Sequence, residues 1–242
     1  MNKNNKKNIS LVVFLCTSFL CAAFGQKEDL KALYAQTLTS PDLSDAVRLA
    51  NFTKITTFSN AYIAENAALR SLFINPDGRV LQRAKIQVEK FPLSESIRLR
   101  YAELLFENKN YTELLLLSRQ IPYNFSSDDS RFRLLALQSA DALGDSSYIE
   151  LVISWFSLFP FDTNHAEFCK TRSFSALPHY VQDLCLARFY VYERDYIPAL
   201  VRSKQFIQFS RENNDKTMYE RLVLSDIGKA FLYGSRTYEA DA

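Results

Sequence analysis

Histidine and cysteine, the side chains that most often bind metals or act as nucleophiles, are scarce in this sequence. The two histidines are His165 and His179, and we expect each to begin a helix or lie in a loop rather than bind a metal. The five glycines form no phosphate-binding loop, and no convincing Ser-His-Asp set can be assembled. The sequence therefore predicts no metal, no cofactor and no enzymatic activity.

Two cysteines remain once the N-terminal segment that holds Cys16 and Cys21 is set aside. Cys169 and Cys185 flank a short connection that contains Pro178. An exported protein meets an oxidising compartment, where a disulfide between them is permitted. Two buried free thiols are an equal alternative, because unpaired cysteine packs as a small hydrophobic residue.

One acidic residue beside a serine has the form of a catalytic pair. Glu95 and Ser96 stand where a helix is expected to begin, and lytic transglycosylases place a Glu-Ser pair at a helix end. In that family a glycine-containing segment follows the pair, whereas Ile97-Arg98-Leu99-Arg100 follows it here. We therefore interpret Glu95 as a surface acid in a first helical turn, where it suits the helix dipole.

The N-terminus has the pattern of a secretory signal peptide. A lysine-containing start precedes an apolar stretch over residues 9–23, and Ala23-Phe24-Gly25 places small residues at a cleavage site before Gln26. The stretch is short for a membrane span, so an uncleaved anchor is one alternative. A lipid anchor on Cys21 is another, although Leu20 is bulkier than a lipobox prefers. We predict an exported protein of the periplasm or envelope that meets the membrane only through such an anchor.

Charge and composition restrict the partners. The chain has 29 basic and 27 acidic residues, and residues 1–25 hold three lysines and no acid, which leaves 26 against 27. A nearly neutral chain lacks the electrostatic footprint of a nucleic-acid-binding protein. With 48% hydrophobic residues, 19 phenylalanines and 13 tyrosines, it can build a sizeable core in which aromatics fill the spaces between helices.

Helical patterns cover most of the remaining chain. Helices are expected over residues 27–38, from 40 onward, 58–73 and 79–90, with a turn at residues 75–78. Helical hairpins then follow over residues 94–120, 130–159 and 179–211, and a fourth begins near residue 216. Residues 161–177 read as an irregular insertion. The predicted division is a signal peptide over residues 1–25, an N-terminal helical region over 26–92 and hairpins over 93–242, the last one incomplete.

Small and large residues recur at fixed spacing in these hairpins. The third has Leu186, Ala187 and Tyr190 on its first helix, then Tyr196 and Ala199 on its second. This pattern resembles the tetratricopeptide repeat, in which small residues allow close helix contact and large ones fill the gaps. The fourth hairpin repeats it with Gly228, Phe231 and Ala240, and the first keeps Ala102, with Leu114 in place of the second small residue.

The resemblance implies an all-α fold of antiparallel hairpins stacked as a right-handed solenoid. The second-helix positions Leu114, Leu151, Ala199 and Ala240 are 37, 48 and 41 residues apart, whereas the family repeats about every 34 residues. An irregular helical bundle is therefore the alternative. The last hairpin stops soon after its second helix begins, which favours a fragment of a longer protein.

Tetratricopeptide arrays bind peptides in a groove lined by their first helices, so the resemblance implies a non-enzymatic scaffold for a protein or peptide in the cell envelope. The alternative is the helical superstructure domain of a soluble lytic murein transglycosylase that lacks its catalytic domain, with peptidoglycan as the partner. A lipid-tethered envelope-assembly component is a third hypothesis. The implied groove contacts are Glu103, Glu107, Arg188, Tyr192, Lys229 and Tyr233.

Overall fold

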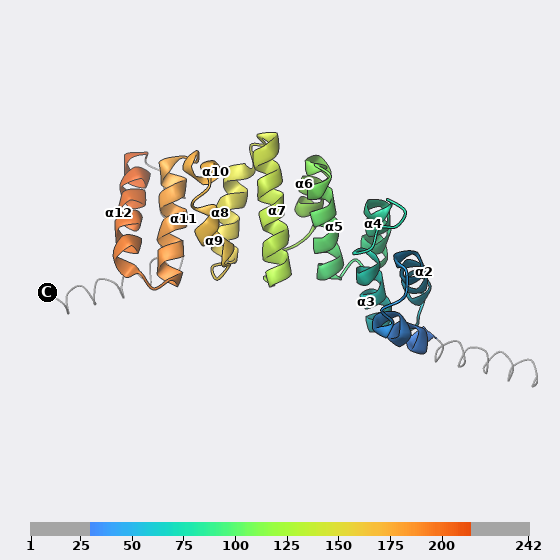
Figure 1. The fold of residues 1–242 in the computed structure, drawn as a ribbon. Coiled ribbons are helices and arrows are strands. Elements are labelled where there is room, and N and C mark those ends of the chain that lie inside the picture. The colour runs from blue at the N-terminus through green and yellow to red at the C-terminus, as the bar shows by residue number, and fades with distance from the viewer. Residues whose placement is uncertain (1–29, 214–242) are drawn as a thin grey trace, which may run out of the picture. The chain divides into compact units, whose positions relative to one another are not determined.

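The computed structural model describes residues 30–213, and these residues form helices and turns without any strand (Figure 1). The predicted all-α class is confirmed. None of the helices in this range is long and apolar enough to cross a bilayer. The predicted signal peptide and the predicted fourth hairpin lie outside the described residues.

The chain divides into two compact units. The boundary between them falls between Leu104 and Leu105, inside one helix. This division lies C-terminal to the predicted boundary between residues 92 and 93. Each unit is described by itself below.

The first unit contains a helical segment over residues 30–39, followed by α2 (Asp45–Ile55), α3 (Ala61–Ser71), α4 (Val80–Lys90) and the start of α5 (Glu95–Glu107). Helices α2 and α3 pack together. Their core is small, with the buried residues Leu30, Phe52, Ile55, Phe58 and Ala67.

The second unit continues from α5 with α6 (Tyr111–Gln120), α7 (Ser127–Leu143) and α8 (Tyr148–Leu158). Two short helices follow, α9 (Asn164–Phe168) and α10 (Arg172–Ser175). The unit ends in the hairpin of α11 (His179–Tyr192) and α12 (Tyr196–Glu212). One core cluster of this unit contains Trp155 and Phe156 of α8, together with Phe168, Phe174 and Val181 from the segments after it.

Within the second unit, α6 packs on α7, α7 on α8, α8 on α11 and α11 on α12 (Figure 1). The pair α11 and α12 is antiparallel: the ring of Tyr180 stacks on Phe209 at 4.7 Å, and Asp183 pairs with Arg202 at 2.9 Å. As the residue number rises on one helix, the contacting number falls on the other. This is the hairpin that the sequence pattern predicts.

Helices α8 and α11 run in the same direction instead. Ile153 of α8 packs against the cluster that contains Leu184, and Phe161, just beyond α8, contacts Tyr192 at the end of α11. Contacts therefore follow the same order along both helices. The reason is that α9 and α10, which replace the irregular segment expected over residues 161–177, carry the chain back between them.

Three hairpins share one turn. A residue with positive φ follows the first helix of each within two residues, and the amide after that residue donates to a carbonyl five positions earlier, as in a Schellman motif. The φ values are 59° at Lys109, 62° at Gly144 and 62° at Arg194. The donors and acceptors are Asn110 to Leu105 at 2.8 Å, Asp145 to Ala140 at 2.9 Å and Asp195 to Tyr190 at 2.9 Å.

Several helices begin at other residues than predicted, because a capping side chain fixes where each one starts. Ser44 caps α2, so this helix begins at Asp45 rather than near Ser40. Asn60 caps α3, and Ser126 caps α7, which therefore begins three residues before the predicted Ser130. The Asn75–Gly78 turn forms as predicted, with Gly78 at a φ of 68°.

Candidate binding site

The predicted groove residues occupy different environments. Glu103 is half-buried, with its carboxylate 3.0 Å from the guanidinium of Arg100, while Glu107 is exposed at the end of α5. Arg188 and Tyr192 are half-buried on α11. The remaining predicted contacts, Lys229 and Tyr233, lie outside the described residues.

The predicted repeat-packing residues of the third hairpin lie at helix interfaces. Ala187 is fully buried in one cluster with Phe206 of α12, and Ala199 is also buried. Leu186, Tyr190 and Tyr196 are half-buried. Ala102 of the first hairpin is fully buried, whereas Gly228, Phe231 and Ala240 lie outside the described residues.

A cavity of about 600 Å³ opens where the start of α7 meets the end of α8. Its lining includes Ser130 of α7 and Phe159 just after α8. Two phenylalanines at its edge are largely exposed, Phe125 to 64% and Phe161 to 81%. The volume is in the range of small-ligand pockets.

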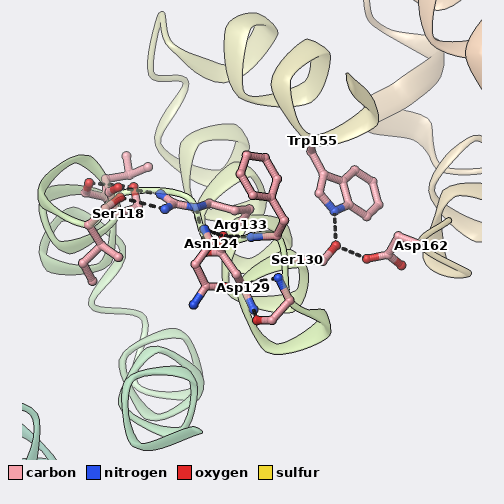
Figure 2. Close-up of polar contacts among 11 residues, drawn as sticks. Ser118, Asn124, Asp129, Ser130, Arg133, Trp155 and Asp162 are labelled. Carbon is pink, nitrogen blue, oxygen red and sulfur yellow. Dashed lines mark hydrogen bonds and ion pairs between the residues drawn. The ribbon is translucent and has the colours of Figure 1, made fainter. Parts of the chain in front are cut away.

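The side chain of Asp129 fixes the backbone of the segment that carries the lining residue Phe125. Its carboxylate accepts hydrogen bonds from the amides of Asn124 at 2.8 Å and Phe125 at 3.4 Å (Figure 2). Phe125 has a φ of 64°, which costs a non-glycine residue about 1–2 kcal/mol. The two hydrogen bonds hold it in this conformation, so the exposed ring is built into the cavity edge.

Asp129 also forms a buried ion pair with Arg133. The Nε of Arg133 lies 3.1 Å from Asp129, and the two side chains are 4% and 2% exposed. The other guanidinium nitrogens donate to the carbonyls of Ser118 at 2.6 Å and Ile121 at 2.7 Å, the last groups of α6 (Figure 2). The guanidinium also lies 4.0 Å from the ring of Tyr123. These contacts fix the connection from α6 to α7.

Ser130 links the cavity to the core. Its hydroxyl accepts a hydrogen bond from the indole of Trp155 at 3.0 Å and donates to Asp162 (Figure 2). Burial acts to raise the pKa of Asp162, but hydrogen bonds from Ser130 and Asn164 outweigh it and hold that pKa below its usual value. Asp162 therefore stays ionised at the lower edge of the cavity.

His165 lies at the start of a helix, as expected. Its side chain is packed among aromatic rings and only 1% of the residue's surface is exposed. Its ring stacks on Phe156 at 4.1 Å and meets Trp155 edge-on at 4.4 Å. Burial lowers the pKa of His165 to about 4, although the charge of Asp162 opposes this. The proton of Ser130 goes to Asp162 and not to this imidazole, so Ser130, His165 and Asp162 lack the hydrogen-bond order of a nucleophilic triad.

The two cysteines pack in the same core cluster as free thiols. Burial raises the pKa of Cys169 to about 12 and also raises that of Cys185. Both are therefore protonated and poorly nucleophilic at neutral pH. Their pairing in an oxidising compartment stays a prediction.

Glu95 and Ser96 lie half-buried in the first turn of α5. No cluster of metal-ligating side chains occurs within residues 30–213.

Sequence reasoning missed the cavity and the residues around it. The signal was present in part, because Asp129 and Arg133 are four residues apart, a spacing that places them on one helix face. Burial of that pair, and the meeting of Phe125 with the α8–α9 connection, depend on contacts between segments that a spacing pattern does not encode.

No family model matches the chain, and no curated protein or solved structure is significantly similar to it. The tetratricopeptide and transglycosylase resemblances therefore rest on the residues alone.

Proposed function

We propose that the protein is an exported, non-enzymatic scaffold that binds a protein or peptide partner through tetratricopeptide-like hairpins. The observation that carries this proposal is the turn that recurs after α5, α7 and α11 with a residue of positive φ and the same hydrogen bond from the amide after it. Repeated hairpins that each bury one face against a neighbour are the building units of helical repeat proteins, whose common role is to present extended binding surfaces.

Buried small residues support the same proposal. Ala187 and Ala199 lie in the interface of the third hairpin, where the family places its small residues. Tyr192, one of the implied groove contacts, remains partly exposed and touches Phe161 at 4.9 Å. An aromatic pair at this position offers a rigid apolar contact for a partner.

Capture of partners from an envelope extract tests the proposal. The chain is purified as the cell processes it, immobilised, and compared with Arg188→Ala and Tyr192→Ala. Thr112→Ala, at an exposed position of α6, is the matched control. We expect a discrete set of proteins that the control retains and the two α11 variants lose, while the helical circular dichroism of all variants is unchanged. Equal retention by all variants would show that the α11 face is not the binding surface.

The same-direction packing of α8 and α11 favours a second candidate, the irregular helical superstructure of a lytic transglycosylase. A regular tetratricopeptide array has no such same-direction packing between the second helix of one hairpin and the first helix of the next. Co-sedimentation with purified peptidoglycan separates the two candidates: binding to the glycan without any protein partner would favour the second one.

A further inference from the structure

Aromatic rings from two connections line the cavity, and two further aromatic rings pack against them. The lining rings are Phe125 of the α6–α7 connection and Phe159 and Phe161 of the α8–α9 connection. Tyr123 lies beside Phe159, and Tyr192 at the end of α11 lies beside Phe161. The rings of Tyr123 and Phe125 lie 6.3 and 6.4 Å from that of Phe159, and Phe161 lies 4.9 Å from Tyr192. Rigid aromatic surface of this kind is typical of the anchoring centre of protein interfaces.

Several polar groups of the cavity form hydrogen bonds within the protein. Asp162 accepts from Ser130 and from both the amide and the side chain of Asn164, at 2.8 and 2.7 Å for the latter two. The hydroxyl of Ser126 accepts from the amide of Asp129 at 3.0 Å. The lining residues Asp128 and Arg131 also have interaction partners. The lining also offers a ligand apolar surface, from Phe125, Leu158, Phe159, Pro160 and Phe161.

The charged side chains that line the cavity also restrict which ligands it can bind. The lining contains two carboxylates, Asp128 and Asp162, and one guanidinium, Arg131. The resulting negative balance disfavours an acidic ligand and suits an uncharged or basic one.

We infer that this cavity binds an aromatic side chain presented by an uncharged or basic peptide segment of a partner protein. This inference rests on the proposed scaffold function and names the place and chemistry of one contact. The volume of about 600 Å³ accommodates one large side chain with its flanking backbone. Phe125 adopts a strained conformation with positive φ, and this conformation places its ring at the edge of the cavity. Backbone strain of this kind is concentrated at binding sites.

A glycan fits the cavity less well. Sugars expose many hydroxyl groups, and burying them without hydrogen-bond partners is unfavourable. Because Asp162, Asn164 and Ser126 already form hydrogen bonds within the protein, the cavity offers a sugar fewer such partners than its polar residues alone would suggest.

The experiment is ligand-observed saturation-transfer NMR on the chain as the cell processes it. The probes are an N-acetylated dipeptide amide of lysine and phenylalanine, the matching lysine-alanine amide, and di-N-acetylchitobiose. Trp155, the sole tryptophan of the chain, hydrogen-bonds to cavity residue Ser130, so its emission gives a second, local readout. We expect saturable transfer to the phenylalanine ring, a concurrent change in Trp155 emission, and little transfer to the other two probes.

Phe125→Ala and Phe161→Ala are expected to weaken binding of the aromatic probe at least about fivefold. Phe73→Ala is the matched control, because Phe73 is 64% exposed like Phe125 but belongs to the first unit. No saturable binding of the aromatic probe, equal binding by all three variants, or preferential binding of chitobiose would overturn the inference. If partner capture by the chain persists while the probe fails, the scaffold function stands and only this site is wrong; loss of all protein capture would instead refute the scaffold.

Discussion

At the scale of single residues, the Asp129–Arg133 pair shows how a charged contact can serve the fold. Removing two charges from water is costly, and the cost is offset only when the remaining donors are also satisfied. Here the guanidinium donates to one carbonyl of α6 and one just after it, and the carboxylate accepts from two amides of the α6–α7 connection. The pair therefore fixes the connection that carries Phe125.

Breaking this pair should be far more damaging than breaking an exposed one. Arg133→Met leaves the Asp129 charge buried and two carbonyls unbonded, and we expect the free energy of unfolding to fall by about 3–5 kcal/mol. Urea denaturation measures the change. Lys170→Ala, which removes the exposed pair between Lys170 and Glu167, is the control and should leave the midpoint almost unchanged. Equal midpoints for the two variants would contradict this account of the pair.

His165 predicts a pH dependence of stability. Its pKa is about 4 in the folded chain and about 6.5 when unfolded, so the unfolded chain binds the proton more readily. The free energy of unfolding should therefore fall as pH drops from about 6.5 to 4, by roughly 3 kcal/mol, and this contribution is constant above that window. Denaturation of the wild type and His165→Phe across this range checks it: the variant should lose less stability on acidification. Parallel pH profiles would show that His165 is not buried in its neutral form.

At the scale of elements, the shared hairpin turn uses three different residues at one backbone position. Glycine adopts positive φ without steric cost, whereas Lys109 and Arg194 do not. The turn therefore forms with or without glycine at this position, and the backbone hydrogen bond of the following amide is common to all three.

Substitutions at these positions should have opposite signs. Gly144→Ala is expected to lower the free energy of unfolding by about 1 kcal/mol through conformational strain, since a Cβ there meets no neighbouring atom. Lys109→Gly and Arg194→Gly should raise it by a few tenths to about 1 kcal/mol, because relief of strain is partly offset by backbone entropy. Thermal or urea denaturation measures all three. Stabilisation by Gly144→Ala would show that the turn tolerates a side chain at no cost.

Sequence patterns predicted the elements better than their packing. The bounds of α6 agree with prediction because Asn110 and Pro122 flank a clear apolar run. The start of α2 was wrong because Ser40-Pro41 resembles a cap, while Ser44 makes the hydrogen bond to the amide of Val47. Helices α9 and α10 were missed because each is shorter than a periodic pattern can reveal, and they form through ring contacts with Phe156. The cavity beside them was missed for the same reason.

At the scale of the whole molecule, two features of the second unit stand together. Its hairpins share one type of turn, yet the neighbouring helices α8 and α11 run in the same direction. Helical hairpins can therefore keep the same turn while an insertion, here α9 and α10, changes the direction of the helix that follows. This combination explains why the hairpin anchors are 37 and 48 residues apart over the described chain, rather than evenly spaced.

Export is the whole-chain prediction on which the partner's location depends. We expect mass spectrometry of the chain from its producing cell to show a mature N-terminus at Gln26. Retention of residues 1–25 would support the uncleaved anchor, and a lipid on Cys21 would support tethering; either would contradict a freely exported scaffold.

The most direct test of the scaffold is photocrosslinking in the producing cell. Benzoylphenylalanine replaces Tyr192, beside Phe161, and in a separate strain it replaces exposed Thr112 on α6. The account predicts a discrete protein adduct at position 192 that is absent at position 112 and survives peptidoglycan digestion. Absence of a protein adduct at position 192, equal adducts at both positions, or an adduct released by that digestion would contradict it.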